Sequence, residues 1–167
     1  MKQSNMVKVS GFFNNVSILI LTLILLIVYA FLGDRVGIWY DDQGISIYTI
    51  SRNMFFYYCF GLSIVYNLLF YLFKKFYFKK SGIKDPGQQE VGYKNALITW
   101  WNFIIISINF FFLCFLIFTG LANNAQDYKF SSVTLIPIIG IVPLMLAIFS
   151  LPAVYFYIIR NFKKKLI

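Results

Sequence analysis

The sequence predicts an all-α integral membrane protein with four transmembrane helices arranged as two hairpins. Of its 167 residues, 60% are hydrophobic and only 13% are charged, whereas soluble domains carry about 25% charged residues. The charged residues are missing from four long blocks, which is typical of membrane spans. A basic segment at 74–94 separates two pairs of these blocks. We therefore treat 1–167 as a single four-helix membrane domain.

The first apolar block, 12–32, predicts the first transmembrane helix. Its 21 residues contain the run ILILTLILLIVYAFL. A helix of this length extends for ~31 Å, which matches the hydrocarbon core of a bilayer. A cleavable signal peptide is the alternative, because lysines precede the block and Val28-Tyr29-Ala30 resembles a cleavage site. The block is long for a signal peptide, which favours the membrane helix.

The first loop, 33–51, predicts a short outer β-hairpin on the membrane surface. Two runs of β-branched and aromatic residues, 36–40 and 45–50, flank a turn in which Gly44 can take a positive φ. Aromatic side chains in this loop are expected at headgroup level. The candidate outer contact loop comprises Trp39, Tyr40, Asp41 and Asp42. We interpret the two aspartates as a polar turn, because Ca²⁺ needs about six to eight oxygen ligands.

Three further blocks predict the remaining helices, at 53–73, 96–119 and 133–159. Ser51 or Asn53 can cap the second helix and Asn95 the third. The last block contains Pro143 and Pro152, which are expected to bend its helix. Neighbouring helices in a membrane can satisfy the carbonyl groups that such prolines leave free.

The cations predict the orientation. Twelve of the fifteen lysines and arginines lie in the two terminal segments and in the basic loop 74–94, and three lie in the other two loops. The positive-inside rule then places both termini in the cytoplasm. The Lys-rich composition, with abundant Phe, Ile, Asn and Tyr, suggests a bacterial cytoplasmic (inner) membrane. The lysines expected to contact anionic lipid headgroups are Lys74, Lys75, Lys79, Lys80, Lys163, Lys164 and Lys165.

Composition also excludes several classes of site. The net charge of +9 is concentrated beside apolar blocks, which indicates contact with lipid headgroups and excludes nucleic acid as the expected partner. The chain has no histidine, so haem ligation by histidine and most zinc sites are excluded. We expect no catalytic, cofactor or metal site. Cys59 and Cys114 are expected to be small buried hydrophobes.

Amide and hydroxyl side chains are the candidate polar contacts inside the membrane. Asn102 and Asn109 are seven residues apart and so share one stripe of the third helix, while Asn67 and Ser63 lie on the second. Counting from the cytoplasmic helix ends, Asn67 and Asn102 have comparable depth, which predicts a hydrogen bond between them. The alternative is that these amides line a substrate or ion path.

The fourth helix carries a narrow stripe of small residues. Gly140, Pro143, Ala147 and Ser150 fall on one face of it. Small residues allow another backbone to come close. This helix is therefore expected either to pack centrally in the bundle or to dock a partner.

The arrangement of a four-span chain with an outer β-hairpin bearing Gly37-Ile38-Trp39 resembles the claudin-type pattern. The loop is far shorter than in that family and has no pair of cysteines, so the resemblance concerns architecture and implies no membership.

Three function hypotheses remain from the sequence. The first is a non-enzymatic structural or accessory subunit of a larger membrane protein complex, because four short-looped helices suit a protein that works by packing on others. The second is a small oligomeric transporter or channel with an amide-lined path. The third is a membrane-embedded enzyme on lipid substrates, which would have to use the loop acids Asp41, Asp42, Asp85 and Glu90.

Overall fold

The computed structural model describes residues 5–41, 43–79, 88–124, 133–158 and 160. These residues form four long helices, α1 (Asn5–Phe31), α2 (Arg52–Lys79), α3 (Gln88–Asn124) and α5 (Leu135–Ile158). A β-hairpin of β1 (Arg35–Tyr40) and β2 (Ser46–Ser51) lies between α1 and α2. Each helix contains a stretch long and apolar enough to cross a membrane. The predicted fold class is therefore confirmed, and the chain is a multi-pass membrane protein.

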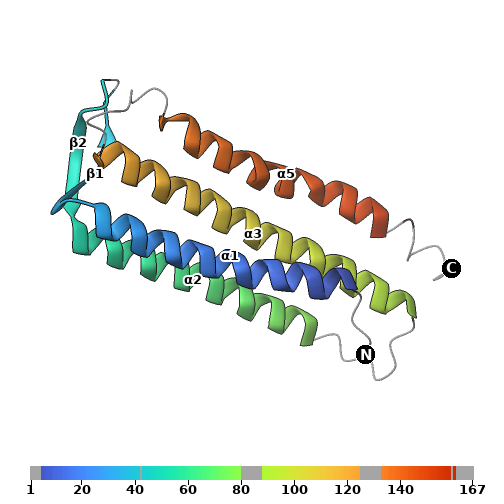
Figure 1. Ribbon diagram of the computed structural model, residues 1–167. Coiled ribbons are helices and arrows are strands. Elements are labelled where there is room, and N and C mark those ends of the chain that lie inside the picture. The colour runs from blue at the N-terminus through green and yellow to red at the C-terminus, as the bar shows by residue number, and fades with distance from the viewer. Residues whose placement is uncertain (1–4, 42, 80–87, 125–132, 159, 161–167) are drawn as a thin grey trace.

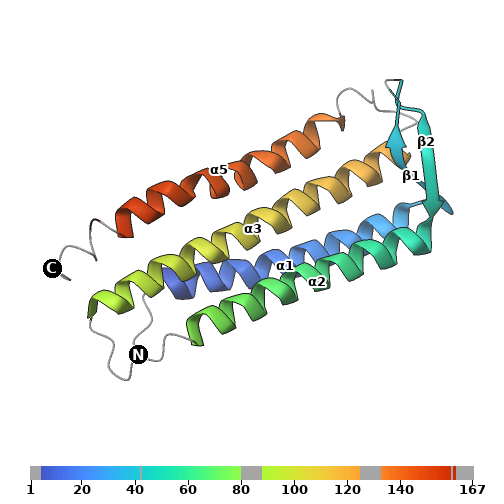
Figure 2. The ribbon, with the colours of Figure 1, turned by 180° about the vertical axis from the view of Figure 1, so that it is seen from behind.

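Helix α3 is the centre of the arrangement. Figures 1 and 2 show α5 on one side of α3, with α1 and α2 on the other. Helices α1 and α5 both pack extensively on α3, whereas α2 makes fewer contacts with α1 and α3. Among the described residues, no Cα atom of α5 comes within 8 Å of α1 or α2. The helices thus do not form a closed four-helix bundle, because α5 is attached through α3 alone.

Helices α1 and α3 run parallel with a constant offset. The hairpin marks one end of the molecule, the hairpin end, and the residues that flank the basic segment 74–94 mark the other, the basic end (Figure 1). Ser10 bonds to Asn102 and Ser17 to Asn109, each pair separated by 92 residues. Nearer the hairpin end, a Cβ on Gly120 would lie 3.3 Å from Val28. Small residues in α1 and α3 therefore let the two helices lie close along most of their length.

The helices are longer than the apolar blocks that predict them. Helix α3 begins at Gln88 rather than at 96, α1 begins at Asn5 rather than at 12, and α2 continues to Lys79. Hydropathy marks the part of a helix that lies in hydrocarbon and does not mark its hydrogen-bonded ends. Polar helix-forming residues, such as those at the start of α3, extend the helix beyond the bilayer core.

The hydrophobic core lies toward the hairpin end, between α1, α2, α3 and β1. Val36 of β1 is fully buried in it. The hairpin is therefore part of the packed structure and closes this end of the helices. The core residues are Leu21, Leu25, Val28, Leu32, Val36, Phe55, Cys59, Phe112 and Leu116.

The predicted turn of the hairpin is observed. Gly44 has a φ of 83°, and its amide bonds to the carbonyl of Asp41. The strands pair antiparallel with Arg35 opposite Ser51 and Trp39 opposite Tyr48, and the register shifts on either side of Trp39. Such irregularities twist a strand and re-aim its side chains.

Candidate functional site

Polar side chains from three helices form two hydrogen-bonded groups inside the membrane-spanning region, and together with Asn14 we call them the polar seam. All four buried polar residues of the described chain, Asn102, Ser107, Asn109 and Thr119, belong to α3. Two of them, Asn102 and Asn109, bond to other helices. The polar seam comprises Ser10, Asn14 and Ser17 of α1, Tyr66, Asn67 and Lys74 of α2, and Asn102 and Asn109 of α3.

Asn109, which is 1% exposed, connects all three helices near the middle of α3. Its Oδ1 accepts hydrogen bonds from the Tyr66 hydroxyl and from Asn67 Nδ2, the latter at 3.1 Å. Its Nδ2 donates to Ser17 Oγ at 2.9 Å. Asn67 also donates to the carbonyl of Ser63 on its own helix. The buried amide is fully satisfied, as a polar group removed from water requires.

Asn102 forms a second junction nearer the basic end and is fully buried. Lys74 Nζ donates to Asn102 Oδ1 at 2.7 Å, and Asn102 Nδ2 donates to Ser10 Oγ at 2.9 Å. The ammonium of Lys74 thus bonds inward to an amide, and contact of this partly exposed side chain with lipid headgroups stays a prediction. Lys75 is exposed. Lys80 and Lys163–Lys165 lie outside the described residues, as does the side chain of Lys79.

The predicted hydrogen bond between Asn67 and Asn102 is wrong. Asn67 pairs with Asn109, and Lys74, seven residues later, pairs with Asn102, seven residues before Asn109. The antiparallel register of α2 and α3 is thus displaced by seven residues, about 10 Å along the helix axis, from the predicted pairing. The displacement arises because the two helices do not end at the same depth: beyond the Lys74–Asn102 pair, α3 extends for fourteen residues to Gln88, whereas α2 extends for only five residues to Lys79.

Asn14 lies between these two junctions. Ser10, Asn14 and Ser17 are spaced by four and three residues, which places them on one face of α1. The Oδ1 atom of Asn14 is buried and has no hydrogen-bond partner in the described part of the chain. The sequence analysis missed all three residues. Their spacing, which matches the seven-residue spacing of Asn102 and Asn109, is the signal that could have revealed them.

The small-residue stripe of α5 lies against α3. Gly140 is buried, and a Cβ built on it would lie 2.8 Å from Cys114 Cβ and 3.2 Å from Phe111 Cα. Ala147 is fully buried. The stripe thus packs on α3 within the molecule, but α5 does not lie centrally in the bundle as one alternative had it, because among the described elements α5 contacts α3 alone. Pro143 is partly buried on the same helix.

Trp100 attaches α5 to α3 nearer the basic end. Its indole N–H lies 3.0 Å from Ser150 Oγ and 3.2 Å from the Ala147 carbonyl. Trp101 donates instead to the Phe70 carbonyl of α2 at 3.3 Å. The two adjacent tryptophans therefore link α3 to opposite neighbours.

Asn123 fixes the hairpin to the end of α3. Its Oδ1 accepts from the Gly37 N–H at 2.6 Å, and its Nδ2 donates to the Gly37 carbonyl at 3.1 Å. The side-chain amide thus pairs with the edge of β1 much as a neighbouring strand would. A Cβ at Gly37 would lie 2.5 Å from Ser46 Oγ, so this position has no room for a side chain. The sequence analysis missed Asn123.

Tyr40 turns inward and does not join the outer surface of the hairpin. Its hydroxyl donates to the Gly37 carbonyl at 2.7 Å and accepts from Asn123 Nδ2 at 2.8 Å. Its ring packs edge-on against Phe118. Burial raises the pKa of Tyr40 to about 12, although the hydrogen bond from Asn123 opposes the shift. Tyr40 thus contacts Gly37, Asn123 and Phe118 within the molecule, and its place at headgroup level stays a prediction.

The outer surface of the hairpin exposes four large apolar side chains beside polar ones such as Thr49. The apolar ones are Trp39, Ile45, Ile47 and Tyr48, each at least 60% exposed. Trp39 and Tyr48 are opposite each other in the sheet. Because Asn123 and the buried Val36 fix the hairpin to the helices, these apolar side chains are presented in defined positions.

Asp41 stabilises the hairpin turn. Its Oδ1 accepts from the N–H groups of Gln43 and Ile45 at 2.9 and 2.7 Å, which is an Asx-type turn. Asp42 lies outside the described residues. Among the described residues, no group of three His, Cys, Asp or Glu side chains is placed to hold a metal ion. Cys59 lies in the core cluster, and Cys114 faces Gly140 of α5, so the two free thiols lie on different sides of α3.

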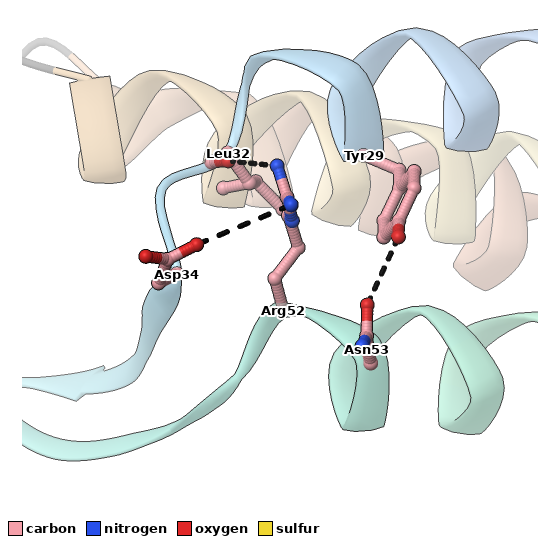
Figure 3. A network of polar contacts seen from close by, with 5 residues as sticks. All are labelled: Tyr29, Leu32, Asp34, Arg52 and Asn53. Carbon is pink, nitrogen blue, oxygen red and sulfur yellow. Dashed lines mark hydrogen bonds and ion pairs between the residues drawn. The ribbon is translucent and has the colours of Figure 1, made fainter.

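The connection from α1 to α2 is held by a second set of polar contacts, shown in Figure 3. The Arg52 guanidinium bonds to the Leu32 carbonyl at 3.2 Å, so it satisfies a carbonyl at the end of α1. It also lies 4.0 Å from Asp34 and 5.2 Å from the centre of the Tyr29 ring. The Tyr29 hydroxyl bonds to Asn53. These exposed contacts position the helix ends and contribute modestly to stability.

Comparison of the chain with protein-family models, with curated proteins and with solved structures gives no match.

Proposed function

We propose that this protein is a non-enzymatic structural or accessory subunit of a larger membrane protein complex, in the bacterial cytoplasmic membrane with both termini in the cytoplasm. In this proposal the protein works by packing on other membrane proteins, and its outer hairpin is the principal contact surface. The orientation rests on the distribution of cations along the chain.

The exposed apolar side chains of the hairpin carry the proposal. Side chains that face lipid are expected to be apolar, so the exposed faces of the helices need no partner. The hairpin lies beyond the ends of the helices, where Trp39, Ile45, Ile47 and Tyr48 are nevertheless exposed. Several large apolar side chains exposed outside the hydrocarbon region favour a protein contact. Its attachment through Asn123 means that little order has to be gained when a partner binds.

The small-residue stripe of α5 is not available for a partner, because Gly140 and Ala147 are already occupied by α3. We therefore assign the partner contact to the hairpin, because it exposes apolar side chains outside the hydrocarbon region.

The test is purification at native expression level in a mild detergent, followed by measurement of the mass and composition of the particle. We expect stoichiometric unrelated proteins to co-purify. The double variant Trp39→Ser, Ile47→Ser should lose them, whereas Thr49→Ser, an exposed polar position on β2, should retain them. A homogeneous monomer or homo-oligomer from the wild-type protein would refute the proposal. Equal retention by the double variant would refute the role of the hairpin.

The polar seam favours a second candidate, an oligomeric transporter or channel whose path uses Asn67, Asn102 and Asn109. Between Asn109 and the hairpin end, α1 and α3 contribute Leu21, Leu25 and Leu116 to the apolar core. A path through one copy would have to cross this core, which weighs against the candidate. Flux of ions or small solutes into liposomes containing only the purified protein, and its loss in a folded Asn109→Leu variant, would support it.

A further inference from the structure

The space between α1 and α5 forms a trough in the half of the molecule nearer the basic end. Helices α1 and α5 both pack on α3 without touching each other, so α3 is the floor. A groove of about 720 Å³ lies between α3 and α5 and reaches Met6 of α1, and a second groove of about 690 Å³ lies between α1 and α3. Both volumes are within the usual range of ligand sites. Met6, Thr99 and Phe103 line both grooves, so the two grooves adjoin along α3, and together we call them the trough.

The lining of the trough is mainly apolar, although the hydroxyl side chains of Ser17, Thr99 and Ser150 also line it. Phe13, Val16 and Ile20 line the α1 side, and Ala153 and Val154 line the α5 side. Asn5, Asn95 and Tyr157 line the opening at the basic end. Arg160 is exposed one turn beyond Tyr157. No acidic side chain of the described residues lines either groove.

The length of the trough along α1 distinguishes between a lipid and a protein helix as its occupant. On α1 it extends from Asn5 to Ile20, about 22 Å along a helix axis. This covers one leaflet of hydrocarbon, about 15 Å, together with its headgroup zone. A partner's transmembrane helix would need a surface about 30 Å long. The trough therefore fits the acyl chains of one leaflet better than it fits a helix.

We propose that this trough binds an anionic phospholipid of the leaflet at the basic end. The acyl chains lie over Thr99, Phe103 and Phe13, and the phosphate lies at the opening near Arg160. Arg160 follows the lining residue Tyr157 by three residues, which places it on the same side of α5 and beyond the groove toward the basic end. Its charge complements an anionic headgroup, and the apolar walls complement the acyl chains. The lipid would also fill the space between α1 and α5, which no side chain of the described residues closes.

Quenching of Trp100 by brominated phospholipids tests the proposal, because Trp100 lines the trough. The variant Trp39→Phe, Trp101→Phe leaves Trp100 as the single tryptophan, since the chain has three. In vesicles, brominated phosphatidylglycerol should associate about fivefold more strongly than brominated phosphatidylcholine, the effect expected of one nearby cation. Arg160→Gln should abolish this preference. Lys75→Gln, an exposed position on α2, should retain it.

Native mass spectrometry of the protein with its own tryptophans provides an independent test after addition of phosphatidylglycerol. The protein should retain one anionic lipid, and Ala153→Phe, which fills the groove, should retain about tenfold less. Leu151→Phe, at an exposed position of α5 that does not line the groove, should behave as wild type. Equal retention by Ala153→Phe, no preference at Trp100, or occupation of the trough by a protein chain or a second copy would overturn the proposal.

Discussion

Replacement of Asn109 by Leu tests whether the polar seam holds the helices together. Leu keeps the side chain close in size and removes its hydrogen bonds to Tyr66, Asn67 and Ser17. Hydrogen bonds between membrane helices contribute about 0.6 kcal/mol each on average. Three of them give an expected loss of about 2 kcal/mol in the free energy of unfolding. This loss of stability reflects the weakened contact between α1, α2 and α3 at Asn109.

The assay is reversible unfolding in mixed detergent micelles, or steric trapping in bicelles, followed by helix content. Ser107→Ala is the matched control, since Ser107 is buried on the same helix but bonds to Phe103 of its own helix. We expect this variant to lose less than about 0.5 kcal/mol. A loss for Asn109→Leu that is no larger than the loss for Ser107→Ala would refute the reasoning. An unchanged stability with abolished flux would favour the path hypothesis.

Three further predictions concern α5 and the hairpin. Gly140→Leu should destabilise the α3–α5 contact by about 1–3 kcal/mol. Gly61→Leu, where a Cβ meets nothing within 4 Å, should be nearly neutral. Thermal unfolding in detergent compares the two variants, and equal stability would contradict the close approach of Gly140 to α3. Asn123→Ala should weaken the attachment of the hairpin to α3 by about 2 kcal/mol, and residues 35–51 should then be cleaved faster by protease. Asn124→Ala, whose side chain bonds to Gly120 of its own helix, should leave the cleavage rate unchanged. Burial raises the pKa of Tyr40 to about 12, so the folded state favours the protonated phenol. The contribution of this group to the free energy of unfolding is therefore present below pH 10 and is lost as pH rises through about 12. Thermal unfolding of Tyr40→Phe between pH 9 and 12 should lack this part of the pH dependence, and a curve parallel to that of the wild type would contradict the prediction.

The sequence predicted the elements of the fold more successfully than their contacts. Four apolar blocks predicted the helices, and the turn around Gly44 predicted the hairpin. The contact of Asn67 with Asn109 could not be predicted, because hydropathy defines no helix end from which register can be counted. The inward partner of Lys74 was missed for the same reason, since it depends on the register of α2 and α3.

The candidate site was predicted in part. Asn67, Asn102 and Asn109 do lie in the polar seam, but Ser10, Asn14 and Ser17 were missed, because Ser10 precedes the apolar block and single polar residues in apolar blocks are common. Asn123 was missed because its partner is the backbone of Gly37, 86 residues earlier in the chain. A contact of an amide with a main chain leaves no pattern in either segment.

By itself, the sequence determined how many segments are apolar enough to cross a membrane, and where the chain turns between them. Transfer of apolar side chains into hydrocarbon depends on composition and length alone, so local sequence is sufficient for it. Only the tertiary structure decided which helices touch and in what register. Helices that are already in lipid gain no hydrophobic free energy by meeting, so close backbone approach and paired polar groups select the arrangement. These are properties of two surfaces brought together, such as Gly140 on Cys114 or Asn109 on Asn67.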